Sequence, residues 1–292
     1  YTIKILLSLG LIFFLSGVLW GQNLDFPRKS PRASISYTIG YTAITINYSS
    51  PAVRAREIWG VLEPYDKVWR AGANEATTFE FGTDIVIEGK PLPAGKYSFF
   101  MIPRENGPWT AIFNKVADQW GAYEYDKSQD AIRVDAMVKD SDIEEEYLNY
   151  SIVKQGADAG YIRLGWGGKR IYIRFRVEVL DKAMANFDKA LAKVSQENKW
   201  QIYLQGAELL MEFDGHGEEA LDYAEKSTSL QGHFRNWWVR AQLEAELGDF
   251  VSAISSAEKA AAFGLSSDNE IYLQTYKKEI SDKIMEWKKE QR

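Results

Sequence analysis

Hydrophobic residues recur at every second position through residues 34–179, which is the spacing of strands with one buried face. Gly167 and Gly168 lie between two alternating segments, 162–166 and 171–177. Two glycines in that place are typical of a β-hairpin, because its turn requires positive φ. The denser segment 97–102 predicts a central strand buried on both faces. We therefore expect an antiparallel sheet over residues 34–180, a β-sandwich in preference to a barrel-like sheet.

The hydrophobic spacing changes after residue 180 to about 3.6 residues, the period of an amphipathic helix. Ala220 and Ala253 occupy equivalent positions in two helix pairs, and the 33-residue offset is close to the tetratricopeptide period. Ser267 or Asp268 is the expected N-cap of a last, capping helix. The predicted helices span 181–194, 200–213, 217–230, 236–247, 250–263 and 269–289. The predicted fold class is α+β with two domains, an N-terminal antiparallel β-sandwich and C-terminal α-helical tetratricopeptide-like hairpins over 181–292.

The N-terminal residues carry a targeting pattern. An apolar run over residues 5–20 follows Lys4, and at this length it predicts a secretory signal peptide over residues 1–21. An uncleaved membrane anchor is the alternative. Residues 22–33 are expected to form an extended lead-in. Because the chain has no cysteine, a lipobox anchor is excluded, and we expect an exported, periplasmic or secreted protein.

The amino-acid composition limits the kinds of catalytic site, metal site and partner that the chain can have. The absence of cysteine excludes disulfides, thiolate metal sites and cysteine nucleophiles, and both histidines fall in the last third of the chain. The net charge of −6 argues against nucleic acid. From residue 181 onward the chain has 14 basic and 20 acidic residues, so an acidic groove between helices would favour a basic partner. Alternatively, these helices pack against the β-domain and stabilise it. No cofactor and no metal are expected.

Two segments, 51–78 and 114–130, break the alternation and mix aromatic with charged residues. Irregular segments on a rigid sheet are where binding sites tend to lie. Arginine suits carboxylates or phosphates, and tryptophan can pack on a sugar ring. The candidate ligand-binding residues are Arg56, Trp69, Arg70, Asn74, Glu75, Trp120, Tyr123 and Tyr125. The structural alternative is a buried Arg70–Glu75 ion pair, with Asn74 capping backbone groups.

Two further patterns leave alternatives open. A glycosidase-like reaction would need a pair of carboxyl groups, one with a raised pKa. By residue type alone, the candidates for that pair are Glu57, Glu75, Glu124 and Asp126. On the last predicted strand, Arg170, Arg174 and Arg176 share a face with Tyr172, which is either an anion-binding stripe or a solvated sheet face.

Several short motifs resemble one known family. They are SSP at 49–51, WRAGANEAT at 69–77, PAGKYS at 93–98 and WGAYEY at 120–125. Over about residues 30–180 the chain resembles the bacterial domain-of-unknown-function family 2911. The resemblance implies an exported protein of a kind common in Bacteroidetes-type bacteria. It implies no activity, and no catalytic residue can be transferred from it.

Together these patterns predict an exported, non-catalytic binding or scaffold protein. The β-domain is expected to bind a small ligand, a glycan or an envelope component, and the helical repeats a protein or peptide. The alternatives are a periplasmic, carboxylate-dependent hydrolase acting on glycans and a purely structural assembly module. Contact with a membrane is expected only through the signal segment before its cleavage.

Overall fold

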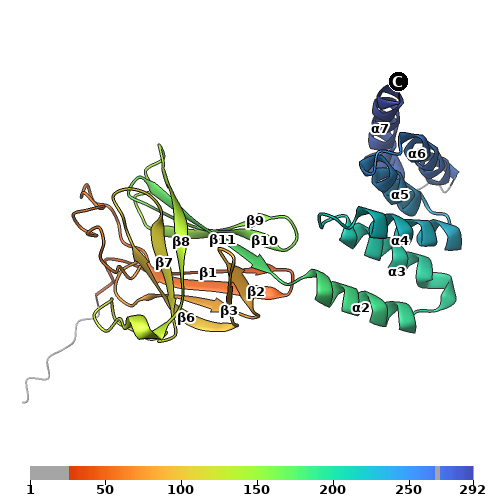
Figure 1. Ribbon diagram of the computed structural model, residues 1–292. Coiled ribbons are helices and arrows are strands. Elements are labelled where there is room, and N and C mark those ends of the chain that lie inside the picture. Colours follow the sequence, from red (N-terminus) through yellow and green to blue (C-terminus); the bar gives the residue numbers. More distant parts are fainter. Residues whose placement is uncertain (1–25, 267–269, 292) are drawn as a thin grey trace, which may run out of the picture.

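The computed structural model describes residues 26–266 and 270–291 (Figure 1). The predicted signal peptide, the first residues of the lead-in and both N-cap candidates, Ser267 and Asp268, lie outside the described residues. Among the helices that are described, none has the length and apolar character needed to cross a membrane.

The N-terminal part is an antiparallel sheet, as predicted. Its principal strands follow the order β1-β2-β3-β6-β7-β8-β11-β10-β9, and the β4–β5 hairpin pairs with β11. The strands are β1 (Arg32–Ile39), β2 (Thr42–Ser49), β3 (Thr77–Phe81), β4 (Ile85–Ile87), β5 (Lys90–Leu92), β6 (Gly95–Ile102), β7 (Trp109–Asn114), β8 (Asp130–Asp140), β9 (Asn149–Gln155), β10 (Ala159–Trp166) and β11 (Lys169–Val177).

The sheet is continuous and curls almost into a barrel (Figure 1). Strand β8 makes the connection, since residues 130–136 pair with β7 and residues 137–140 pair with β11. The two ends of the sheet then approach each other, because β1 contacts β9 and the ring of Tyr48 lies edge-on to that of Tyr150, with 4.9 Å between centroids. Residue alternation is the same in a sandwich and a barrel, so the sequence pattern did not separate these two arrangements.

Two local predictions in the sheet are confirmed. Gly167 and Gly168 both have positive φ and join β10 to β11, with Trp166 paired to Lys169. Strand β6 lies between β3 and β7, and most of its residues are buried on both faces. The interior of the sheet is rich in aromatic rings, so a rigid core supports the loops at its ends.

The C-terminal part is helical, as predicted. Helix α3 packs against α4, and α5 packs against α6. Gly215 and Gly248, both at φ 85°, lie in the turns within these two pairs. The helices are α2 (Leu180–Lys193), η2 (Gln196–Asn198), α3 (Lys199–Leu210), α4 (Gly217–Leu230), α5 (Phe234–Glu246), α6 (Phe250–Ser266), the π-helical turn η3 (Tyr272–Tyr276) and α7 (Lys277–Glu290).

The two parts touch where the chain passes from β11 to α2. Gly40, in the β1–β2 turn, packs so closely that a Cβ there would lie 2.3 Å from a methyl carbon of Val179. Asn186 of α2 donates a hydrogen bond to the hydroxyl of Tyr41 at 3.3 Å. Phe213, from the turn after α3, packs against the core of the sheet. The remaining helices extend away from the sheet (Figure 1).

Candidate functional site

The two irregular segments lie against each other. Ala76 donates its backbone N–H to the carbonyl of Gln119 at 2.9 Å, and Gly121 donates to the carbonyl of Asn74 at 3.0 Å. Residues 114–130, which we call the flap, are therefore joined by backbone hydrogen bonds to the WRAGANEAT loop (residues 69–77). The chain around Asn74 therefore lies beside the chain around Trp120.

Buried polar groups anchor the flap. The side-chain amide of Gln119 donates to the hydroxyl of Ser98 at 3.2 Å and to the side-chain oxygen of Asn114 at 3.3 Å. Asn114 in turn donates to the carboxylate of Asp130 at 2.9 Å. Since Ser98, Asn114 and Gln119 are buried, breaking these bonds would leave polar groups without partners, and the flap is held in one position.

Tyr125 takes part in the contacts that hold the flap against the sheet. Its ring lies edge-on to Phe100, with 5.1 Å between centroids, and its hydroxyl donates to Asp130 at 2.7 Å. Arg133 also contacts that hydroxyl. Burial, together with the hydrogen bond to Asp130, raises the pKa of Tyr125 to about 12. The sequence placed Tyr125 among the ligand-binding candidates, but in the structure its polar group is already occupied.

Two flap aromatics face solvent instead. Trp120 is 58% exposed and Tyr123 is 85% exposed, although their neighbours in the flap are packed against the sheet. The guanidinium of Arg70 lies close by, because a Cβ on Gly121 would be 3.5 Å from its Nη1. The Nε of Arg70 is buried and has no hydrogen-bond partner within the described residues. Arg70, Trp120 and Tyr123 thus form one cluster of an arginine and two exposed rings.

Glu75 does not pair with Arg70, so the predicted Arg70–Glu75 ion pair is wrong. The carboxylate of Glu75 instead lies 2.7 Å from the guanidinium of Arg28 and 2.6 Å from that of Arg32. The hydrogen bond from Arg28, helped by that from Arg32, lowers the pKa of the Glu75 carboxyl to about 2. Asn74 donates to the carbonyl of Ser30 at 3.3 Å, which confirms its expected capping of a backbone group. Glu75 and Asn74 therefore fasten the lead-in to the loop.

Arg56 and Trp69 were also predicted as ligand contacts, and in the structure both contact other groups of the protein. Trp69 is 4% exposed and stacks on Trp166 with 5.8 Å between centroids. Arg56 donates to the carbonyls of Ala52 and Val53, at 2.5 and 2.9 Å, within its own turn. These contacts stabilise the loop that follows β2; Trp69 is enclosed in the core, whereas Arg56 is exposed to solvent.

A polar groove of about 410 Å³ lies beside this cluster, on the outer face of β1, β2, β3 and β6. Trp120 pairs through an isolated antiparallel β-bridge with Glu75, which lines the groove, so its side chain extends from the same face as that of Glu75. The polar side chains that line the groove are Arg32, Ser34, Asn47, Tyr48, Ser49, Glu75, Thr78 and Lys96. Hydroxyls, an amide and charged groups therefore surround this space.

The sequence of residues 30–175 matches the family described as protein of unknown function (DUF2911). The chain belongs to this family. The match contains both irregular segments and ends before α2. No curated protein and no solved structure matches the chain. The DUF2911 domain is therefore the sheet with its flap and groove, and its chemistry has to be read from its own residues.

The four carboxyl groups considered for catalysis have different surroundings in the DUF2911 domain. Glu57 and Glu124 are exposed, and Glu75 is held by two arginines. Asp126 accepts hydrogen bonds from Ser128, which lower the pKa of its carboxyl. Among the described residues, no group of acidic and histidine side chains has the arrangement of a metal site.

The carboxyl with the raised pKa is Glu63, which was not among the candidates. Burial raises its pKa to about 7, although the charges of Arg70 and Arg56 act in the opposite direction. Its position between two exposed hydrophobic residues and a proline gives no sign of burial in the sequence. The enclosure comes from the loop, where Glu63 donates its N–H to the carbonyl of Ile58 at 2.8 Å.

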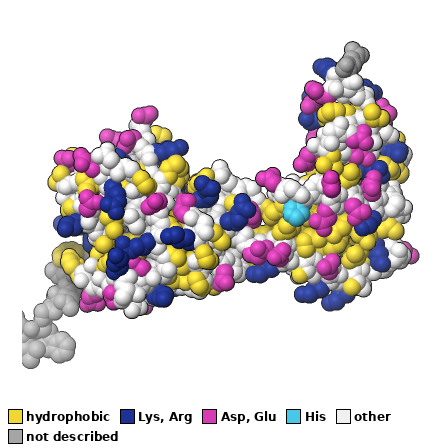
Figure 2. Space-filling model, viewed as in Figure 1, with side chains coloured by type: hydrophobic (Ala, Val, Ile, Leu, Met, Phe, Trp, Pro, Cys, Tyr) yellow, Lys and Arg dark blue, Asp and Glu magenta, His cyan; other side chains and the backbone are white. Residues whose placement is uncertain are grey.

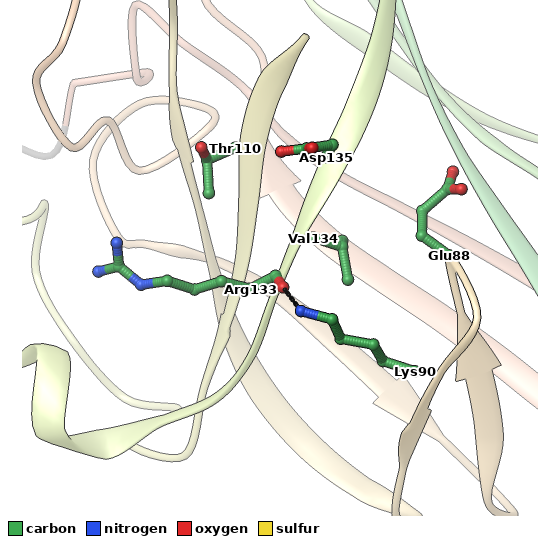
Figure 3. Close-up of a pocket in the computed structure, with 6 residues that line it drawn as sticks. All are labelled: Glu88, Lys90, Thr110, Arg133, Val134 and Asp135. Carbon is green, nitrogen blue, oxygen red and sulfur yellow. Dashed lines mark hydrogen bonds between the residues drawn. The ribbon is translucent and has the colours of Figure 1, made fainter.

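The sequence also did not predict a second pocket of the DUF2911 domain, which Figure 3 shows. It opens where β8 separates from β11 and the β4–β5 hairpin takes its place beside β11. Across this gap of about 320 Å³, Lys90 donates to the carbonyl of Arg133 at 2.7 Å. The lining residues are Glu88, Lys90, Thr110, Arg133, Val134 and Asp135, which come from three separate parts of the chain. Such a grouping depends on strand order and has no local sequence signal.

Proposed function

We propose that this protein is an exported, non-catalytic binding protein whose DUF2911 domain binds a saccharide in the groove beside Trp120. The observation that carries the proposal is the indole of Trp120, which is 58% exposed and belongs to the residue bridged to Glu75 of the polar groove, on a flap that buried hydrogen bonds hold in place. Exposed aromatic rings offer a flat apolar surface, which suits the C–H face of a sugar.

The groove offers hydrogen bonds to the hydroxyls of such a ligand. Asn47, Thr78 and Ser34 lie on neighbouring strands, since Asn47 pairs with Ser34 on one side and with Thr78 on the other. Lys96 lies on β6, which pairs with β3 on the side away from β2, and its ammonium lies 3.3 Å from the carboxylate of Asp118 in the flap. A rigid sheet and an anchored flap present these groups without reordering, which reduces the entropic cost of binding.

Titration with neutral trisaccharides of glucose and of N-acetylglucosamine, followed by calorimetry, tests the proposal. We expect the wild-type protein to bind at least one of them and Trp120→Ala to weaken that binding about tenfold or more. Tyr37→Ala is the matched control, because Tyr37 is an exposed aromatic residue of β1. Equal binding by wild type and Trp120→Ala, or no binding of any neutral sugar, would exclude the proposed site.

Export rests on the apolar segment over residues 5–20 and its preceding Lys4, which together have the form of a signal peptide. Expression of the full chain in a bacterium, with fractionation and N-terminal sequencing, tests it. A processed chain in the periplasm or medium, beginning near Gln22, is the expected result. An unprocessed chain in the cytoplasm would contradict it.

The helices are proposed to be tetratricopeptide-like hairpins that bind a protein or peptide. Support comes from the 33-residue offset, from the full burial of both Ala220 and Ala253, and from the equivalent positive-φ glycines of the two turns. A groove of about 270 Å³ lies along α3, α5 and the start of α7. Figure 2 shows hydrophobic side chains gathered over this helical part among charged ones.

The charge of that groove favours a basic partner. Glu208 is paired with Arg235 at 2.6 Å, whereas Glu279 lines the groove without an ion-pair partner among the described residues. An array of basic and acidic peptides tests the preference. We expect basic peptides to bind and Glu279→Lys to abolish binding, while Glu290→Lys, at the far end of the same helix, does not. A preference for acidic peptides would contradict this assignment.

A further inference from the structure

A second groove crosses the outer face of β8, β10 and β11. It combines the pocket of Figure 3 with a neighbouring cavity of about 530 Å³, and Glu88 and Asp135 line both. The larger cavity adds Met137, Tyr161, Tyr172 and Arg174. We call this surface the β11 groove. It lies on other strands than the groove beside Trp120, so it is a separate site from the one in the proposed function.

The arginines of β11 differ in what they contact. Arg170 donates to the carboxylate of Glu145 at 3.3 Å, and Arg176 lies 3.6 Å from Asp158. Arg174 stands between them on the same exposed face, and its guanidinium has no ion pair and no hydrogen bond within the described residues. Only its backbone is engaged, donating to Glu88 at 2.5 Å. An unpaired guanidinium in a groove is a ready partner for a carboxylate, which it can hold through two parallel hydrogen bonds.

Aromatic rings lie next to this free cation. Tyr161 is the cross-strand neighbour of Arg174 on β10, and Tyr172 lies two residues before it on β11. The two rings are nearly perpendicular, with 6.2 Å between centroids, so they do not stack face to face. The ammonium of Lys139 lies 5.9 Å from the centroid of Tyr172, which adds a second positive charge on the same side. The surface therefore offers ring faces and positive charge together.

The rim of the groove bears the opposite charge. Asp135 and Glu88 are carboxylates at the boundary with the pocket of Figure 3, which Thr110 also lines. A ligand with charge on every side, such as inorganic phosphate, would meet these carboxylates unfavourably. Hydroxyl groups would not, because each carboxylate can accept hydrogen bonds from them.

We infer that the β11 groove binds an acidic sugar, a saccharide with one carboxylate per ring. The carboxylate of the sugar pairs with Arg174, its ring packs on Tyr172 and Tyr161, and its hydroxyls donate to Asp135 and Glu88. A neutral sugar leaves Arg174 unpaired, and an acidic peptide lacks the hydroxyls that Asp135 and Glu88 would accept. The combination of groups selects a ligand that is anionic at one end and rich in hydroxyls at the other.

The test compares trigalacturonate with the neutral galactose trimer by calorimetry, using the full chain. We expect the acidic trimer to bind more tightly than the neutral one, and Arg174→Gln to weaken its binding about tenfold or more. Arg176→Gln is the matched control on the same strand, since Arg176 is exposed and already paired; it should bind as wild type does. Tyr172→Leu should weaken both trimers, because it removes an aromatic face and leaves the charge.

Several outcomes would overturn the inference. They are equal affinity of wild type for both trimers, equal losses in Arg174→Gln and Arg176→Gln, or tighter binding of an acidic peptide than of the acidic sugar. Thermal unfolding of each variant shows that the fold is retained. Trp120→Ala should leave binding of the acidic trimer unchanged, so failure at the groove beside Trp120 and failure here are distinguishable.

Discussion

The carboxylate of Glu75 lies 2.6 Å from the guanidinium of Arg32, the first residue of β1. Arg28 contacts the same carboxylate at 2.7 Å, from the lead-in that precedes the strand. Since Glu75 belongs to the WRAGANEAT loop, which is also joined to the flap, this one side chain connects the start of the sheet to the candidate site. We therefore expect the lead-in, the loop and the flap to respond together when Glu75 changes.

Replacing Glu75 with glutamine should loosen the lead-in more than it lowers global stability. The three side chains are partly exposed, so the ion pairs are screened by solvent, and we expect a fall in melting temperature of about 1–3 °C. Tryptic cleavage after Arg28 should become clearly faster. Glu80→Gln, an exposed neighbour on β3, should change neither. Unchanged cleavage in Glu75→Gln would show that the ion pairs do not hold the lead-in.

The same carboxylate predicts a loss of stability in acid. Its pKa is about 2 in the folded protein and has the ordinary value of 4.5 when unfolded, so the folded state binds its proton less readily. The stabilising contribution is therefore present above pH 4.5 and is lost as the pH falls toward 2. Wild type should lose its advantage over Glu75→Gln across this window in thermal melts. A constant difference between the two proteins would contradict the assignment.

Glu63 predicts the opposite dependence of stability on pH, a loss as the pH rises. Its folded pKa of about 7 lies above the ordinary 4.5, so its contribution is fully present below pH 4.5 and is lost as the pH rises through 7. The loss corresponds to about 3–4 kcal/mol, because the two pKa values differ by about 2.5 units and one unit is about 1.4 kcal/mol. Denaturation at pH 4 and pH 8 should show Glu63→Gln gaining on wild type at the higher pH. Glu57→Gln, exposed in the same loop, should show no such gain.

How far the sequence predicts this site depends on which interactions are local. Alternation along the strands follows from the burial of one face, so the antiparallel sheet was predictable. Trp69 and Trp120 are the same residue type in similar surroundings, and only the packing buries one and exposes the other. The partners of Glu75 lie 43 and 47 residues away, and no spacing rule links positions that meet through strand pairing. Sequence therefore located the segments and tertiary structure assigned the roles.

A larger residue at Gly165 is expected to displace the side chain of Glu145. A Cβ there would lie 2.4 Å from a carboxylate oxygen of Glu145, whose other oxygen accepts a hydrogen bond from Arg170. Gly165→Ala should displace that carboxylate and cost about 1–3 kcal/mol in urea denaturation. Gly82→Ala, where the nearest atom would be 3.4 Å away, should cost less. In a double variant with Glu145→Ala the clash disappears, so the cost should fall below the sum of the two single changes.

Equivalent positions in the two helix pairs should respond equally to overpacking. Ala220 and Ala253 are completely buried, and each lies where two helices of a pair approach closely. Ala220→Leu and Ala253→Leu should each destabilise the helical part by about 1–3 kcal/mol, because the added methyl groups have no space. Helical circular dichroism during urea unfolding measures the effect, and Val251→Leu, at an exposed position of α6, should be nearly neutral. A large effect at only one of the two alanines would mean that the pairs are not structural repeats of each other.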